Sequence, residues 1–192
     1  MSEKLANAAP LGLLGFGMTT VLLNLSNAGL IQLDSMILAM GLVYGGLAQI
    51  IAGSMEYRRG NTFGTVAFSS YGFFWWSLVI LILLPKSSLV SGVLSAASGS
   101  TAAYFIMWGI FTLAMFFGTL KTNRVLQFVF LSLTVLFFAL AIHEAFGLAG
   151  LFVKTVGVEG VICGASAIYL GVAEVLNEAN GKTMLPIGKV TK

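Results

Sequence analysis

Six long apolar runs divide this chain and leave little of it outside them. They lie at residues 10–30, 35–57, 62–84, 102–120, 125–146 and 156–176. A helix of about 20 residues, rising 1.5 Å per residue, spans the hydrocarbon core of a bilayer. The runs are apolar on all sides, unlike the surface helix of a soluble domain. We therefore predict an all-α integral membrane protein built as a bundle of six transmembrane helices.

The composition leaves no room for a soluble domain. Of the 192 residues, 58% are hydrophobic and only 9% are charged, whereas soluble domains carry about 25% charged residues. The six runs and their short loops account for most of the length. We therefore expect a single membrane domain over residues 1–192, which ends in a polar, largely irregular tail at 177–192. The longest loop follows Pro85 and has room for a short interfacial helix.

The basic residues predict the orientation in the membrane. Eight of the ten Lys and Arg residues fall on one side if both termini are cytoplasmic, and cytoplasmic loops are enriched in such residues. The basic residues that give the net charge of +3 are therefore interpreted as orientation signals in an inner (plasma) membrane. They give no reason to expect nucleic acid as a partner. The eight are Lys4, Arg58, Arg59, Lys121, Arg124, Lys182, Lys189 and Lys192; the other two are Lys86 and Lys154.

Small residues recur at four-residue spacing within the spans, which allows helix backbones to approach closely in lipid. We interpret them as seams where helices pack, and they favour a tight bundle over a single anchor. The pairs are Gly41 and Gly45, Ala48 and Ala52, Gly160 and Gly164, and Ala167 and Gly171.

The polar residues within the spans are mostly uncharged donors. Such groups suit a small anion or a neutral solute better than a cation, which prefers carboxylates or rings of carbonyls. No span carries the run of acids that a metal site needs, and we expect no metal or cofactor. Among the hydroxyls we single out Thr19 and Ser70 as pathway candidates. Gln49, flanked by glycines, either bonds a neighbouring helix or lines a pore.

Glu159 is the acid that stands out in the sixth span. One interpretation is a protonatable group that modulates the pore mouth. The other is that it reaches water or pairs with Lys154. The single His143 and single Cys163 do not form a catalytic pair, and the chain carries none of the common hydrolase, nucleotide or metal motifs. We therefore predict that the protein is not an enzyme.

The chain has the colinear motifs NAAPLGL at residues 7–13, YGGLAQ at 44–49 and AFSSYG at 67–72. These motifs resemble those of the acetate uptake transporter family, the membrane proteins with an NPAPLGL signature that include succinate-acetate permeases. The resemblance continues through GNTFG at 60–64, FT at 111–112, RVLQF at 124–128 and GASAIY at 164–169. It covers nearly the whole chain.

The resemblance implies a six-helix protomer with its own pore, assembled into a hexamer that passes acetate and other small carboxylates such as succinate. Channel conduction and proton symport are both proposed for the family. It also implies a hydrophobic constriction in the middle of the pore, which falls on Phe16, Tyr71 and Leu133, and a role in substrate passage for Asn7 and Gln49. The fourth and sixth spans are expected mainly to pack.

Two departures from the family pattern are Ala8, in place of the first signature proline, and Glu159. Pro10 remains suited to the first turn of a helix, and Asn7 remains a candidate cap. Two rival functions stay open. One is a pore for another small solute, such as ammonia, urea or water. The other is a membrane sensor or scaffold that transports nothing.

Overall fold

The protein forms a bundle of helices in the computed structural model, which describes residues 5–87 and 94–190. The described residues contain six helices that are long and apolar enough to cross a membrane. This confirms the predicted fold class. The elements are α1 (Ala9–Asn27), α2 (Ser35–Met40), the π-helix η1 (Gly41–Ala48), α3 (Gln49–Arg58), α4 (Thr62–Leu83), the 3₁₀-helix η2 (Leu84–Lys86), α5 (Ser98–Thr119), α6 (Arg124–Phe146) and α7 (Leu151–Asn180). Together α2, η1 and α3 make one continuous span, Ser35–Arg58.

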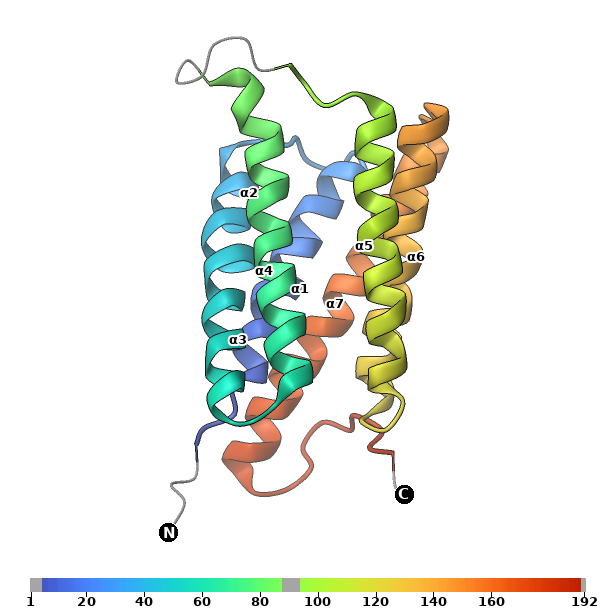
Figure 1. The fold of residues 1–192 in the computed structure, drawn as a ribbon. Coiled ribbons are helices and arrows are strands. Elements are labelled where there is room, and N and C mark those ends of the chain that lie inside the picture. The colour runs from blue at the N-terminus through green and yellow to red at the C-terminus, as the bar shows by residue number, and fades with distance from the viewer. Residues whose placement is uncertain (1–4, 88–93, 191–192) are drawn as a thin grey trace.

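The helices fall into three groups, which Figure 1 shows side by side. Helices α1 and α7 lie between the pair made by the second span and α4 and the pair α5–α6. The first and last described residues of the chain lie at the same end of the bundle. We call this the terminal end and the other the distal end. Helices α1, α4 and α6 all run from the terminal end toward the distal end.

Side-chain caps mark the ends of several spans. The Asp34 carboxylate accepts from the Met36 N–H at 3.0 Å, the Asn61 amide oxygen from the Gly64 N–H at 3.0 Å, and the Asn123 amide oxygen from the Leu126 N–H at 2.8 Å. Each satisfies a backbone donor that has no partner within the helix. At the C-termini of α6 and α7, Gly147 and Gly181 adopt the left-handed conformation that ends a helix.

Glycines set the contact between α1 and α7. A Cβ added at Gly17 would lie 2.7 Å from the Gly164 carbonyl oxygen, and one added at Gly164 would lie 2.7 Å from the Gly17 carbonyl oxygen. A Cβ at Gly160 would collide with the side chain of Asn24. The predicted packing seam of Gly160 and Gly164 is therefore confirmed, and its partner is the first span.

Two helices and the tail differ from the sequence-based expectation. Helix α5 begins at Ser98, and α7 extends beyond 156–176 at both ends, to Leu151 and Asn180. The tail is therefore helical at its start, because the turn signal that ends the helix is Gly181. After it the chain returns beneath α6, where Arg124 N–H donates to the Gly188 carbonyl and Val190 N–H to the Thr122 carbonyl, both at 2.9 Å.

The predicted short helix in the loop after Pro85 falls largely on residues 88–93, which lie outside the described part of the chain, so it stays a prediction; the 3₁₀-helix η2 (Leu84–Lys86) is the continuation of α4.

Candidate pore and its two cavities

A large cavity opens at the terminal end of the bundle. Its volume is about 700 Å³, and charged and amide side chains line it beside apolar ones. The polar lining includes Asn7, Glu56, Arg59, Asn61 and Glu174. These residues come from the segment before α1, from the end of α3, from the N-cap of α4 and from α7. Apolar residues of α4, α5 and α6 complete the lining.

Glu56 is the centre of a hydrogen-bonded network in this cavity wall. Its side chain is fully buried, and Arg59 Nη1 lies 2.5 Å from its Oε1. Asn61 Nδ2 donates to its Oε2 at 2.5 Å, and the Ala8 N–H donates to its Oε1 at 3.2 Å. A buried carboxylate needs such partners to offset its lost hydration. The departure at Ala8 contributes here, because the proline of the family signature has no N–H to donate.

Asn7 joins this network to the last span. Its Nδ2 donates to Glu174 Oε2 at 2.9 Å, and its Oδ1 accepts from Arg59 Nη1 at 2.7 Å. The same oxygen accepts from the Ala9 N–H at 3.2 Å. Asn7 therefore bonds the first residue of α1, but the predicted cap is wrong, because the N-cap position is Ala8. The segment before α1 is therefore held in place by residues of α3 and α7.

A second, smaller cavity lies toward the distal end. Its volume is about 230 Å³, and its lining is mainly apolar and aromatic. Phe16 and Leu133 line it, as do the polar residues Thr20, Asn24 and His143. The His143 ring nitrogen Nδ1 contacts the Leu148 carbonyl oxygen, which fixes the imidazole beside the helix end.

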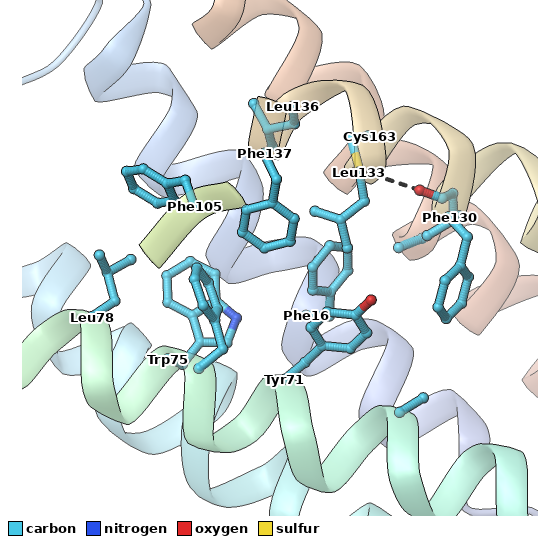
Figure 2. Packing of buried hydrophobic residues seen from close by; sticks show 14 of the residues in the cluster. Phe16, Tyr71, Trp75, Leu78, Phe105, Phe130, Leu133, Leu136, Phe137 and Cys163 are labelled. Carbon is cyan, nitrogen blue, oxygen red and sulfur yellow. Dashed lines mark hydrogen bonds between the residues drawn. The ribbon is translucent and has the colours of Figure 1, made fainter. Parts of the chain in front are cut away.

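A layer of apolar side chains separates the two cavities. Phe16, Tyr71 and Leu133 are 6%, 3% and 3% exposed and belong to one packed cluster, and Figure 2 shows them close together. The Phe16 and Tyr71 ring centroids are 6.0 Å apart, and those of Tyr71 and Phe130 are 6.1 Å apart. Phe130 lines the terminal cavity, whereas Phe16 and Leu133 line the distal one. The structure therefore brings the three predicted constriction residues together between the cavities.

Tyr71 is fixed by a hydrogen bond across the bundle. Its hydroxyl donates to Thr112 Oγ1 of α5 at 2.9 Å, and the Thr112 hydroxyl donates to the Trp108 carbonyl at 2.7 Å. Both side chains are buried. A buried hydroxyl without a partner is costly, so this pair holds the ring of Tyr71 in the apolar layer.

The other pathway candidates lie in different places. Asn7 lines the terminal cavity, but Thr19, Gln49 and Ser70 line neither of the two cavities. The Thr19 hydroxyl donates a hydrogen bond to the Met40 carbonyl oxygen at 3.5 Å, which links α1 to the second span. Gln49 is fully buried beside Gly15, and neither amide atom has a hydrogen-bond partner within the described residues. Its role in the pathway remains a prediction.

Glu159 lies against α6. Ser132 Oγ donates to its Oε1 at 2.5 Å, while its Oε2 is buried without a partner in the described part of the chain. Because α7 already begins at Leu151, Glu159 is more than two turns inside the helix. It lines neither cavity, and its role as a pore-mouth modulator remains a prediction.

Sequence reasoning missed the contribution of the fourth and sixth spans to this site. Thr112 of α5 holds Tyr71, and Glu174 of α7 lines the terminal cavity. The signal available for Glu174 was its position within one helical turn before the start of the polar tail at residue 177. No sequence signal pairs Thr112 with Tyr71, since the contact depends on how two distant helices face each other.

Six membrane-length helices around two cavities and one apolar layer define a membrane transport protein. The chain belongs to the GPR1/FUN34/yaaH family, whose sequence model matches residues 1–192. This confirms the predicted family.

The relatives agree with this class. The chain is 59% identical over 188 residues to the succinate-acetate/proton symporter SatP of Escherichia coli (strain K12), covering 98% of each chain. It is 33% identical over 188 residues to ammonia transport outward protein 2 of Saccharomyces cerevisiae, covering 95% of this chain and 66% of that protein. A solved structure of the bacterial acetate channel SatP matches with a TM-score of 0.92 and 59% identity, covering 96% of this chain and 100% of the other. These relatives are transport proteins and not enzymes.

Proposed function

We propose that this protein carries acetate, and small carboxylates such as succinate, across the membrane. The observation that carries the proposal is the single apolar layer of Phe16, Tyr71 and Leu133 between a polar cavity and a smaller, mainly apolar one. Acetate has one charged group and one methyl group. The polar groups of each cavity suit its carboxylate, and the layer between them suits its methyl group.

The layer determines the barrier to transport. A bare carboxylate in apolar surroundings is strongly disfavoured, so acetate crosses by one of three routes. It passes as neutral acetic acid, it passes with a proton that accompanies the anion, or the layer wets transiently as in hydrophobic gating. The first two routes couple acetate movement to protons, and the third gives channel conduction.

The proposed pathway runs from Asn7 in the terminal cavity, through the constriction, to the distal cavity. Gln49 is included because its buried amide, which has no partner among the described residues, lies beside Gly15, the residue before Phe16. Thr19 and Ser70 remain as candidates in the helices that carry Phe16 and Tyr71. Glu159 is retained as a candidate modulator through its contact with Ser132.

The proposed setting is a homohexamer in the plasma membrane with both termini cytoplasmic. The shared end of the two termini (Figure 1) and the basic residues Arg58, Arg59, Lys121, Arg124 and Lys182 near that end support this orientation. The hexamer rests on the family resemblance. The large apolar side chains exposed on the helices suit contact with lipid or with neighbouring protomers.

Uptake of radiolabelled acetate into proteoliposomes, with and without an imposed pH gradient, tests this proposal. We expect uptake above that of empty vesicles. Acceleration by an inward proton gradient supports the proton-linked routes, and equal uptake supports a channel. Flux of ammonia, urea or water without acetate flux would favour the first rival. No flux of any solute would favour a sensor or scaffold.

Replacing Gln49 with leucine separates a pathway role from a structural one. Gln49→Leu removes a buried polar group that has no hydrogen-bond partner among residues 5–87 and 94–190, so thermal stability is expected to be unchanged or higher. Acetate flux is expected to fall about tenfold. As a comparison, Gln127→Leu should lower stability, because the Gln127 amide donates to the Thr119 and Leu120 carbonyls. Normal flux in Gln49→Leu would remove Gln49 from the pathway.

A further inference from the structure

Two buried donors in the distal cavity have no hydrogen-bond partner in the part of the chain that the structure describes. Trp75 and Thr20 are each only 3% exposed, and both line this cavity. The indole nitrogen Nε1 of Trp75 and the hydroxyl oxygen of Thr20 have no partner among the described residues. Buried donors are nearly always satisfied in proteins. Two orphaned donors in one cavity therefore point to a ligand that accepts hydrogen bonds.

The packing of Trp75 turns its N–H toward the cavity. A Cβ added at Gly45 would lie 2.8 Å from Trp75 Cγ, and one added at Gly41 would lie 3.5 Å from Trp75 Cε3. Helix η1 therefore covers the ring junction and the Cε3 edge of the indole. The nitrogen is on the opposite edge, away from η1. In Figure 2 it lies on the side of the ring nearer Phe16 and Tyr71.

Helix geometry places these donors directly beyond the constriction. Thr20 follows Phe16 by four residues on α1, and Trp75 follows Tyr71 by four residues on α4. Residues four apart lie one above the other on the same helix face. Because α1 and α4 run in the same direction (Figure 1), both steps lead toward the distal end. Thr20 and Trp75 thus form the next layer outward from the constriction.

We propose that the Trp75 N–H and the Thr20 hydroxyl bind the carboxylate of a small monocarboxylate just outside the constriction. The proposal deepens the proposed function and rests on it. An indole N–H donates only, which favours an acceptor such as a carboxylate oxygen. The floor of the cavity includes Phe16 and Leu133, which suits a methyl group pointing toward the constriction. The subsite therefore orients the substrate with its apolar end first.

Other polar side chains that line the cavity are already hydrogen-bonded in part or lie at the end of α6, farther along the chain from the constriction residue Leu133. The Asn24 amide donates to the Thr20 carbonyl at 2.9 Å, and its Oδ1 accepts from Asn27 Nδ2 at 3.0 Å. Asn24 is therefore already satisfied in part and positions the turn that carries Thr20. His143 and Glu144 also line the cavity, but they belong to the last turn of α6.

Conservative substitutions test the subsite. Trp75→Phe and Thr20→Val remove each donor and retain most of the side-chain volume. Trp76→Phe is the matched control, because the Trp76 N–H is already bonded to the Leu42 carbonyl at 2.8 Å. Thr134→Val is the second control, since its hydroxyl donates to the Phe130 carbonyl at 2.8 Å. Two readouts are needed: acetate saturation kinetics in proteoliposomes, and the change in tryptophan fluorescence on titration with acetate.

We expect each subsite substitution to raise the acetate concentration for half-maximal flux about tenfold, as expected for the loss of one hydrogen bond to a charged group. The controls should change it less than twofold. The acetate-dependent fluorescence change should persist in Trp76→Phe and vanish in Trp75→Phe. Equal half-saturation in Trp75→Phe and Trp76→Phe, or a fluorescence change that survives Trp75→Phe, would overturn the subsite and indicate that water satisfies these donors. Absence of acetate flux in the unmodified protein, with the Trp75 signal present, would overturn the proposed function and not the subsite.

Discussion

Gly164→Ala is expected to destabilise the bundle more than any exposed substitution, by about 3 kcal/mol or more. The new Cβ would lie 2.7 Å from the Gly17 carbonyl oxygen and 2.9 Å from the Val21 backbone nitrogen. Overpacking a core costs roughly 1–3 kcal/mol when side chains can shift. Here the obstacle is the backbone of α1, so the two helices must separate. Because α1 carries Phe16 and Thr20, acetate flux should fall together with stability.

Gly99→Ala is the matched control for this prediction. Gly99 lies in the first turn of α5, and a Cβ there would meet nothing within 4 Å. Alanine favours a helix over glycine by about 0.5–1 kcal/mol, so this variant should be as stable as the unmodified protein or more so. Thermal unfolding of the two purified variants in detergent gives the comparison. Equal stability of Gly164→Ala and the unmodified protein would show that the α1–α7 contact is looser than the structure indicates.

The helices and their packing seam were predictable because they depend on local sequence. Apolar runs of membrane length have one stable conformation in lipid, where every backbone polar group must bond within its own helix. The spacing of Gly160 and Gly164 predicted a close contact, but not that α1 would be the partner. The π-helical turn η1 was not predictable. Its residues, Gly41–Ala48, read as ordinary helix, and the contacts of Trp75 and Trp76 with its glycines appear only in the folded structure.

The candidate site was predictable only in part. Phe16, Tyr71 and Leu133 came from the family resemblance, and nothing in the apolar runs alone distinguishes them from their neighbours. Asn7 was found through its motif, whereas Glu174 and Thr112 act through contacts between distant segments. That Trp75 and Thr20 lack partners among the described residues is also a property of the packed structure. In the sequence, both residues read as ordinary members of a membrane span.

Leu133→Ala is expected to join the two cavities and raise acetate flux about tenfold. Leu133 is 3% exposed, lines the distal cavity, and packs in one cluster with Phe16 and Tyr71. Removing three carbons from this layer leaves a gap that water can enter. A tenfold rise corresponds to lowering the barrier by ~1.4 kcal/mol. The wider gap should also admit benzoate, whose ring the unmodified layer should exclude.

Leu131→Ala is the control on the same helix, because Leu131 is 47% exposed and lines neither cavity. It should leave both acetate flux and the exclusion of benzoate unchanged. Because Leu133 is buried, Leu133→Ala is expected to lose about 2–5 kcal/mol of stability. Acetate flux is therefore compared per amount of folded protein, which size-exclusion chromatography of the reconstituted sample measures. Unchanged acetate flux and continued exclusion of benzoate in folded Leu133→Ala would place the barrier elsewhere. A rise in both would locate it at the layer formed by Phe16, Tyr71 and Leu133, since no other cavity-lining side chain would have changed.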